Sequence, residues 1–209
     1  MRIVKCRRVA GEFKLSKTTI NEARKLYSTG NLLVYPTDTV YGLGGDPFQE
    51  NVVRRIFDSK RRHKEMPMSM AVPSHEALWF YGFLNNATHE FCLKYLPGPV
   101  TILLIATSLA PKHIVSPDGL IGLRIPDHPI ASQLLRSLGP LTATSANHHG
   151  QPPPVTCKEA IEQLGDDVSL YLDAGPCKHG RESTVVDLSG ETRKIIRQGV
   201  LSEEDMRNA

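Results

Sequence analysis

The segment from residue 35 to residue 46, YPTDTVYGLGGD, concentrates side chains that can bind a polar ligand. It places three hydroxyls and a carboxylate within five residues, those of Thr37, Asp38, Thr39 and Tyr41. The apolar run at residues 32–35, typical of a short buried strand, precedes them. Polar, glycine-rich turns after core strands are where open α/β sheets bind ligands. The segment therefore indicates a ligand site, and the alternative is a structural glycine turn with internally bonded threonines.

The glycines of this segment do not match a known phosphate loop. A Walker A loop ends in Gly-Lys-Ser or Gly-Lys-Thr, whereas this segment continues as Gly-Gly-Asp-Pro. A dinucleotide fingerprint requires glycine where Pro47 stands. The role of the segment has to be judged together with the rest of the chain.

Four cations stand at predicted junctions between strands and helices: Lys60, Arg62, Arg124 and Arg197. Arginine binds phosphate or carboxylate through two parallel hydrogen bonds, and lysine acts as a point charge. The polar pairs Ser145/Asn147 and Ser183/Thr184 occupy similar junctions. This pattern indicates a ligand with more than one negative charge. The alternative is a set of surface residues in local ion pairs.

Residues that are missing exclude several kinds of catalytic site. The chain has no Gly-x-Ser-x-Gly elbow and no His-x-x-x-His spacing, and no Ser-His-Asp order stands out. Its four cysteines form no Cys-x-x-Cys pair and are expected to be reduced thiols. Covalent and zinc catalysis are therefore disfavoured. Positioning and electrostatic stabilisation remain, as in phosphoryl and nucleotidyl transfer.

Strands and helices alternate along most of the chain. Strands are expected at residues 2–6, 32–35, 68–72, 100–106, 120–125, 141–144, 168–173, 184–188 and 194–197. Expected helix caps are Thr19 with Glu22, Asn51, Ser74, Asp127, and Thr156 with Glu159, and a further helix spans residues 87–95. The pattern predicts an α/β fold with one domain over residues 1–209, built on a twisted mixed sheet with packed helices. It leaves the strand order open.

The bulk composition is that of an ordinary globular protein. The chain has 209 residues, of which 40% are hydrophobic and 22% charged, with a net charge of +3. No signal peptide is visible, and the longest apolar run, at residues 100–106, is too short to span a bilayer. A soluble cytoplasmic protein with no membrane partner is expected, and its mild positive charge permits an anionic ligand such as a nucleotide or RNA.

Seven segments, in order and over nearly the whole chain, resemble the YrdC family. They are Tyr35-Pro-Thr-Asp-Thr-Val-Tyr-Gly-Leu-Gly, Lys60-x-Arg62 with Pro67, Leu96-Pro-Gly-Pro-Val-Thr, Gly122-Leu-Arg-Ile-Pro126, Thr144-Ser-Ala-Asn147 with Gly150-x-Pro152, Ser183-Thr-Val-Val-Asp187 and Ile196-Arg197-x-Gly199. The resemblance implies a YrdC-like fold and a nucleotidyltransferase that makes threonylcarbamoyl-AMP from L-threonine, bicarbonate and ATP. It also implies that the product serves threonylcarbamoyladenosine modification of tRNA.

The resemblance further implies site residues and partners. The L-threonine site would comprise Thr39, Arg124, Ala143 and Ser183. The ATP site would comprise Lys60, Arg62, Met66, Ser145, Asn147, Pro153 and Arg197. Mg²⁺ is expected on the phosphates, without an assigned protein ligand. A tRNA threonylcarbamoyltransferase is the expected downstream partner, and tRNA or double-stranded RNA is a further candidate.

The sequence departs from the family pattern at two positions. Ala71 stands where many relatives carry histidine, and Pro153 stands where a serine often contacts nucleotide. Longer relatives also append a second domain that covers the site. Two other readings stay open: an RNA-binding module without catalysis, and the carbamoyl-adenylate domain of the hydrogenase-maturation carbamoyltransferase.

Overall fold

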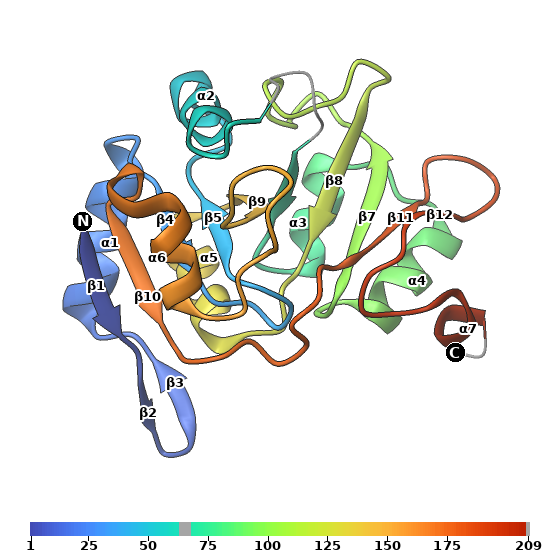
Figure 1. Ribbon diagram of the computed structural model, residues 1–209. Helices are drawn as coiled ribbons and strands as arrows, with labels where there is room; N and C mark the ends of the chain where they lie inside the picture. The colour runs from blue at the N-terminus through green and yellow to red at the C-terminus, as the bar shows by residue number, and fades with distance from the viewer. Residues whose placement is uncertain (63–67, 208–209) are drawn as a thin grey trace.

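The computed structural model of the protein describes residues 1–62 and 68–207. Within these residues a ten-stranded sheet has the order β1-β10-β4-β5-β9-β6-β8-β7-β11-β12 (Figure 1). Four neighbouring pairs are parallel and five are antiparallel, which confirms the predicted mixed sheet. The strands are β1 (Arg2–Lys5), β4 (Leu33–Tyr35), β5 (Gly42–Gly44), β6 (Ser69–Ala71), β7 (Val100–Ile105), β8 (Leu120–Arg124), β9 (Leu141–Ser145), β10 (Leu170–Asp173), β11 (Thr184–Asp187) and β12 (Lys194–Arg197).

Helices cover both faces of this sheet. The described helices are α1 (Lys17–Ser28), α2 (Glu50–Ser59), α3 (His75–Tyr81), α4 (Asn86–Tyr95), α5 (Pro129–Leu138), α6 (Cys157–Leu164) and α7 (Glu203–Arg207). Alternate residues of β4 show the division, since successive side chains of a strand point to opposite faces. Val34 belongs to the buried cluster that includes residues of α2, α3, α4 and α6. Leu33 and Tyr35 belong to the cluster that includes residues of α1 and α5.

The glycines predicted to form a loop belong to a central strand. β5 pairs with β4 on one side and with β9 on the other, so only residues 36–41 remain as a loop. A Cβ atom on Gly44 would lie 2.8 Å from Cε1 of Tyr35, and one on Gly42 would lie 3.1 Å from its Cζ. The glycines therefore make room for a fully buried ring across the pair. Gly42 also lines the pocket described below.

Helix α1 begins earlier than predicted. Its cap is Ser16, whose hydroxyl accepts from the Thr19 backbone N–H at 3.0 Å. Thr19 therefore lies inside the first turn, and the predicted capping box with Glu22 is wrong. Two residues with equally good capping chemistry stand three positions apart, and sequence alone did not separate them.

The caps of α2 and α5 also differ from the prediction, whereas the cap of α6 is confirmed. The residue before α2 is Gln49, so Asn51 is not its cap. The cap of α5 is His128, one residue after the predicted Asp127, because Pro129 occupies the first helical position that proline favours. At α6 both hydrogen bonds of the Thr156–Glu159 capping box are present.

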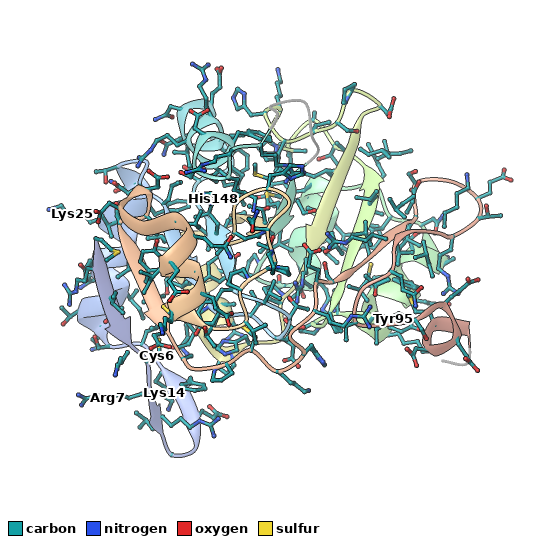
Figure 2. The ribbon with its side chains drawn as sticks, viewed as in Figure 1. Cys6, Arg7, Lys14, Lys25, Tyr95 and His148 are labelled. Atoms are coloured by element: carbon teal, nitrogen blue, oxygen red, sulfur yellow. The ribbon has the colours of Figure 1, made fainter. Side chains whose placement is uncertain are left out.

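The sequence analysis did not predict a short hairpin. β2 (Arg7–Val9) and β3 (Glu12–Lys14) form a separate two-stranded sheet that projects beyond the main one (Figure 1). Its turn places Ala10 and Gly11 at φ of 52° and 85°, and alanine gives no signal for such a turn. The exposed side chains of Arg7 and Lys14 stand opposite each other on this hairpin (Figure 2).

No helix within the described residues is long and apolar enough to cross a membrane. The four cysteines are free thiols, as predicted. Burial raises the pKa of Cys6, Cys92 and Cys157 to about 12, and that of Cys177 to about 11. They are therefore poor nucleophiles.

Candidate active site

A pocket of about 520 Å³ lies where several strands of the sheet end. The loop between β4 and β5, strands β6 to β9, and strands β11 and β12 all contribute lining residues. Ten of the predicted site residues line it: Thr39, Lys60, Arg62, Arg124, Ala143, Ser145, Asn147, Pro153, Ser183 and Arg197. The remaining one, Met66, lies outside the described residues. The fold thus gathers into one cavity residues that are far apart in the sequence.

The hydroxyls of Thr37 and Thr39 have defined donor and acceptor roles. Thr37 Oγ1 donates to the carbonyl of Val40 at 2.6 Å, so it accepts from Thr39 Oγ1, which lies 2.9 Å away. Thr39 Oγ1 also accepts from Arg124 Nη1 at 2.7 Å. Because a hydroxyl has one hydrogen and two lone pairs, Thr39 retains one lone pair. It can therefore accept a hydrogen bond from the amine or hydroxyl of a ligand.

Arg124 is held in place by a buried carboxylate. Its Nη2 lies 2.6 Å from Asp38 Oδ1, and its Nε donates to the carbonyl of Gly98 at 3.2 Å. The side chains of Asp38 and Arg124 are 2% and 10% exposed, so solvent screens this pair little. Together with the bond to Thr39, these contacts use one hydrogen on each nitrogen. Among the residues that the structure describes, they leave one N–H on each terminal nitrogen for a ligand.

The end of helix α2 positions Lys60 and Arg62. The N–H of Arg62 bonds to the carbonyl of Phe57 at 2.9 Å, and the N–H of Arg61 bonds to that of Asp58 at 3.0 Å. This pair of bonds is a Schellman motif, and Arg61 occupies its left-handed position at φ 53°. The chain therefore reverses sharply after Lys60. Both of the predicted phosphate-facing cations reach the pocket from this turn.

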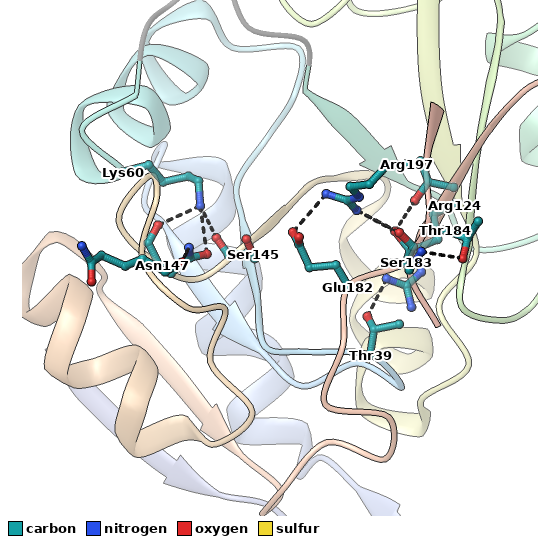
Figure 3. Close-up of polar contacts among 12 residues, drawn as sticks. Thr39, Lys60, Arg124, Ser145, Asn147, Glu182, Ser183, Thr184 and Arg197 are labelled. Atoms are coloured by element: carbon teal, nitrogen blue, oxygen red, sulfur yellow. Dashed lines mark hydrogen bonds and ion pairs between the residues drawn. The ribbon is translucent and has the colours of Figure 1, made fainter. Parts of the chain in front are cut away.

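Lys60 is a buried ammonium surrounded by oxygen atoms. It is 3% exposed, and its Nζ donates to the backbone carbonyls of Ser145 and Asn147, the latter at 2.8 Å. Asn147 Oδ1 lies 3.4 Å from the same nitrogen (Figure 3). Burial lowers the pKa of Lys60 to about 7, and the charge of Arg62 adds to this effect. Lys60 therefore anchors the loop after β9 and titrates near neutral pH.

Asn147 is buried and serves the same loop. Its Nδ2 donates to the carbonyls of His148 at 2.9 Å and Gln151 at 2.7 Å. The backbone N–H of His149 donates a hydrogen bond of 2.7 Å to the backbone carbonyl of Lys60. These contacts shape the wall of the pocket from within. Asn147 thus shapes the wall and at the same time lines the cavity.

Ser183 lies at the opposite side of the pocket from Lys60 (Figure 3). Its hydroxyl lies 2.8 Å from Thr101 Oγ1, and both residues are buried. Arg197 Nη2 donates to the Ser183 carbonyl at 2.9 Å, and its Nη1 forms an ion pair of 3.1 Å with Glu182. The sequence analysis grouped Thr184 with Ser183. The Thr184 hydroxyl instead stabilises the turn after β12, through hydrogen bonds with Gly199 and Leu201.

The two departures from the family pattern both lie on the pocket wall. Ala71 at the end of β6 is buried and contributes only a methyl group to the pocket wall. Pro153 lines the wall beside Tyr41, whose N–H bonds to the neighbouring Pro154 carbonyl at 2.9 Å. Neither position offers a side-chain hydrogen bond to a ligand.

Four polar residues of the site received no individual role from the sequence, although Thr37 and Asp38 belong to the segment that indicated a ligand site. Thr37 and Asp38 orient Thr39 and Arg124, and Thr101 bonds to Ser183. The fourth, Glu182, faces Arg197. All four stand inside or beside the recognised segments, so proximity in sequence was the available signal. The hydrogen-bond partners that give them their roles come from other strands.

Two groups of polar residues thus face one cavity. Arg124 and Thr39 offer paired N–H donors and an acceptor, a set that fits the carboxylate and amine of an amino acid. Lys60, Arg62 and Arg197 offer positive charge, a set that fits phosphates. Burial lowers the pKa of Arg62, and Glu182 partly offsets this effect. No covalent nucleophile is needed to hold two such ligands side by side.

Comparison with known proteins identifies a matching family model and similar proteins. A model of the Sua5, YciO and YrdC family, described as "Telomere recombination", matches residues 25–199. A Mycobacterium tuberculosis relative is 38% identical over 176 residues, which cover 84% of this chain and 81% of the relative. The threonylcarbamoyl-AMP synthase of Vibrio campbellii is 32% identical, with 84% of this chain and 96% of that protein covered.

A solved structure shows the same fold. The crystal structure of Pyrococcus abyssi Sua5 complexed with L-threonine superposes with a TM-score of 0.92 at 29% identity. The match covers 100% of this chain and 60% of that one, so the chain spans somewhat more than half of the longer protein. The chain belongs to the Sua5/YciO/YrdC family.

Proposed function

We propose that this protein synthesises L-threonylcarbamoyl-adenylate from L-threonine, bicarbonate and ATP, with release of pyrophosphate. The observation that carries the proposal is that one pocket of about 520 Å³ combines a set of residues around Arg124 that suits an amino acid with a cationic set around Lys60. The names of the relatives support the same reaction, since curated members are threonylcarbamoyl-AMP synthases.

The chemistry consists of two displacements. The amine of threonine attacks the carbon of bicarbonate, and water leaves. The oxygen of the resulting carbamate then attacks the α-phosphate of ATP, and pyrophosphate leaves. Holding the reactants in line and screening phosphate charge supply most of the rate in such transfers.

The residues have distinct proposed tasks. Arg124 holds the threonine carboxylate through its two remaining N–H groups, and Thr39 accepts from the amine or the side-chain hydroxyl. Ser183 and Ala143 complete the threonine pocket. Lys60, Arg62 and Arg197 neutralise the triphosphate, while Ser145, Asn147 and Pro153 belong to the nucleotide side.

Mg²⁺ is part of the proposal. When bound to the triphosphate, it supplies positive charge to the leaving pyrophosphate. No group of three or more His, Cys, Asp or Glu side chains within the described residues forms a metal site. Phosphate and water oxygens would therefore supply most of its ligands, as is usual for Mg²⁺.

The product determines the wider role. A carbamate–phosphate anhydride is reactive, so a downstream tRNA threonylcarbamoyltransferase is the proposed consumer. The proposed location is the cytoplasm, where such a consumer would act on tRNA.

Pyrophosphate release tests the reaction. Purified protein is mixed with ATP, Mg²⁺, L-threonine and bicarbonate, and each substrate is omitted in turn. Release that requires both threonine and bicarbonate is expected. Release supported by carbamoyl phosphate instead would point to the hydrogenase-maturation reaction, and no release at all would refute the proposal.

RNA binding is a second candidate function, favoured by the N-terminal charge. Residues 1–17 contain six Lys or Arg and one Glu, a net charge of +5, while the whole chain carries only +3. Arg7 stands directly opposite Lys14, and like charges at such positions repel each other. A nucleic-acid backbone would relieve this repulsion, so we propose that tRNA contacts the hairpin.

The salt dependence of tRNA binding tests this contact. Replacing Arg7 and Lys14 with serine should reduce the slope of log affinity against log salt by about two, with pyrophosphate release unchanged. The matched control replaces Arg54 and Lys158, two exposed cations on α2 and α6, and should keep the slope. An unchanged slope in the hairpin variant would exclude this surface.

A further inference from the structure

Glu182 is a negatively charged residue on a part of the pocket wall that otherwise carries positive charge. Among the described residues that line the pocket it is the only carboxylate, and the other charged lining residues at the nucleotide side are Lys60, Arg62 and Arg197. A carboxylate repels phosphates and therefore weakens the binding of a bare triphosphate. Its presence among the phosphate-binding cations calls for a positive partner in the bound state.

The backbone of Glu182 is fixed by close packing. Its carbonyl accepts from the N–H of Val200 at 3.0 Å. A Cβ atom on Gly199 would overlap the carbonyl groups of Glu182 and Ser183, so only glycine allows this approach. The turn after β12 thus holds residue 182 at the pocket edge.

The side chain of Glu182 is free to change partners. It is 38% exposed, and its ion pair with Arg197, itself 45% exposed, joins two partly solvated groups. Such pairs are weak, so a stronger ligand can replace either member. Figure 3 shows Glu182 between the Lys60 group and the Ser183 group. Its charge raises the pKa of both Lys60 and Arg62, which places it within electrostatic reach of the two cations.

We propose that Glu182 is the protein's ligand for the Mg²⁺ ion that accompanies the triphosphate. Mg²⁺ in nucleotide sites is typically bound by one or two carboxylates together with substrate phosphates and water, and this pocket supplies one carboxylate. When the metal–nucleotide complex binds, Arg197 passes from Glu182 to a phosphate oxygen and Glu182 turns to the metal. The inference rests on the proposed ATP site.

Two titrations of ATP, one in excess Mg²⁺ and one in EDTA, separate this role from a purely structural one. Without threonine and bicarbonate no turnover occurs, so calorimetry reports binding alone. In Glu182→Gln, affinity for metal-free ATP should rise about three- to tenfold, because a repulsive charge is removed and Arg197 is released. The enhancement of affinity by Mg²⁺ should fall at least about tenfold relative to the natural protein.

Glu191→Gln is the matched control, since Glu191 is exposed and lies outside the pocket. It should keep both affinities. If Glu182→Gln gains metal-free affinity but keeps the full enhancement by Mg²⁺, phosphates alone hold the metal and the inference is overturned. If the natural protein binds no ATP under either condition, the proposed function itself fails. Melting temperatures verify that both variants fold.

Discussion

At the scale of single residues, the site depends on which hydrogen atom each group supplies. The bond from Thr37 to the carbonyl of Val40 leaves Thr39 as an acceptor for its ligand. The Asp38 carboxylate holds the Arg124 guanidinium, and the described residues leave one N–H on each of its terminal nitrogens unused. The Thr37–Asp38–Thr39 sequence thus sets which donors and acceptors the proposed amino-acid site offers.

Arg124→Lys tests this arrangement. Lysine retains the charge next to Asp38 but lacks the planar pair of donors that matches a carboxylate. We expect L-threonine to bind about 10- to 100-fold more weakly, with ATP affinity changed by less than about threefold. Calorimetric titration of each ligand measures both effects. A larger loss for ATP than for threonine would contradict the assignment.

Lys60 should make nucleotide binding dependent on pH. Burial lowers the pKa of this amine to about 7, and a bound triphosphate raises it again because opposite charge favours the ammonium form. Binding therefore takes up protons, and affinity falls as pH rises from about 7 toward the higher pKa of the complex.

Proton uptake is measured from binding heats in buffers of different ionisation enthalpy, at saturating Mg²⁺ and slightly above neutral pH. The Lys60→Met variant serves as control and should show none. Equal heats, after correction for the buffer, in the natural protein would refute the predicted uptake.

The sequence indicated the pocket-lining residues better than it indicated the residues that support them. Lys60, Arg124 and Ser183 were assignable because their types and neighbours match a family pattern. Asp38 and Thr101 gain their roles from partners 86 and 82 positions away, in strands whose order the sequence left open. Glu182 could not be assigned from the sequence, because its proposed role depends on the three cations that line the pocket with it, Lys60, Arg62 and Arg197.

At the scale of elements, the sheet order explains the site. β5 lies between β4 and β9, so the loop at residues 36–41 ends beside Ser145 and Asn147. A strand with two glycines gave no periodic signal, and its composition resembled a turn. The helices themselves were predictable from their apolar faces. The caps of α1, α2 and α5 were not, because several neighbouring polar residues could each have occupied the cap position.

Gly199→Ala tests the contribution of the turn after β12. The added methyl group would collide with the backbone of Glu182 and Ser183, and backbone atoms cannot move aside as a flexible side chain would. We expect a loss of about 1–3 kcal/mol of unfolding free energy together with weaker ATP binding. Denaturant titration and calorimetry provide the two readings.

Gly190→Ala is the control for this variant. An added Cβ at Gly190 meets nothing within 4 Å, so its stability and ligand affinity should remain unchanged. Equal effects of the two substitutions would show that close packing at residue 199 is not the cause.

At the scale of the whole molecule, one sheet carries both groups of polar residues that line the pocket. The predicted α/β architecture is confirmed, and its match to Pyrococcus abyssi Sua5 extends over the full chain. Three of the six cations of residues 1–17, Arg7, Arg8 and Lys14, lie on the β2–β3 hairpin, and none of the three lines the pocket. Catalysis and any contact with RNA are thus assigned to different parts of the protein.

The identity of the nucleotide product tests the central claim most directly. The protein is incubated with ATP, Mg²⁺ and L-threonine in either ordinary or carbon-13 bicarbonate, and the products are analysed by mass spectrometry. We predict a threonylcarbamoyl-adenylate whose mass increases with the heavy label. An adenylate without the label, or none at all while ATP is consumed, would contradict the account.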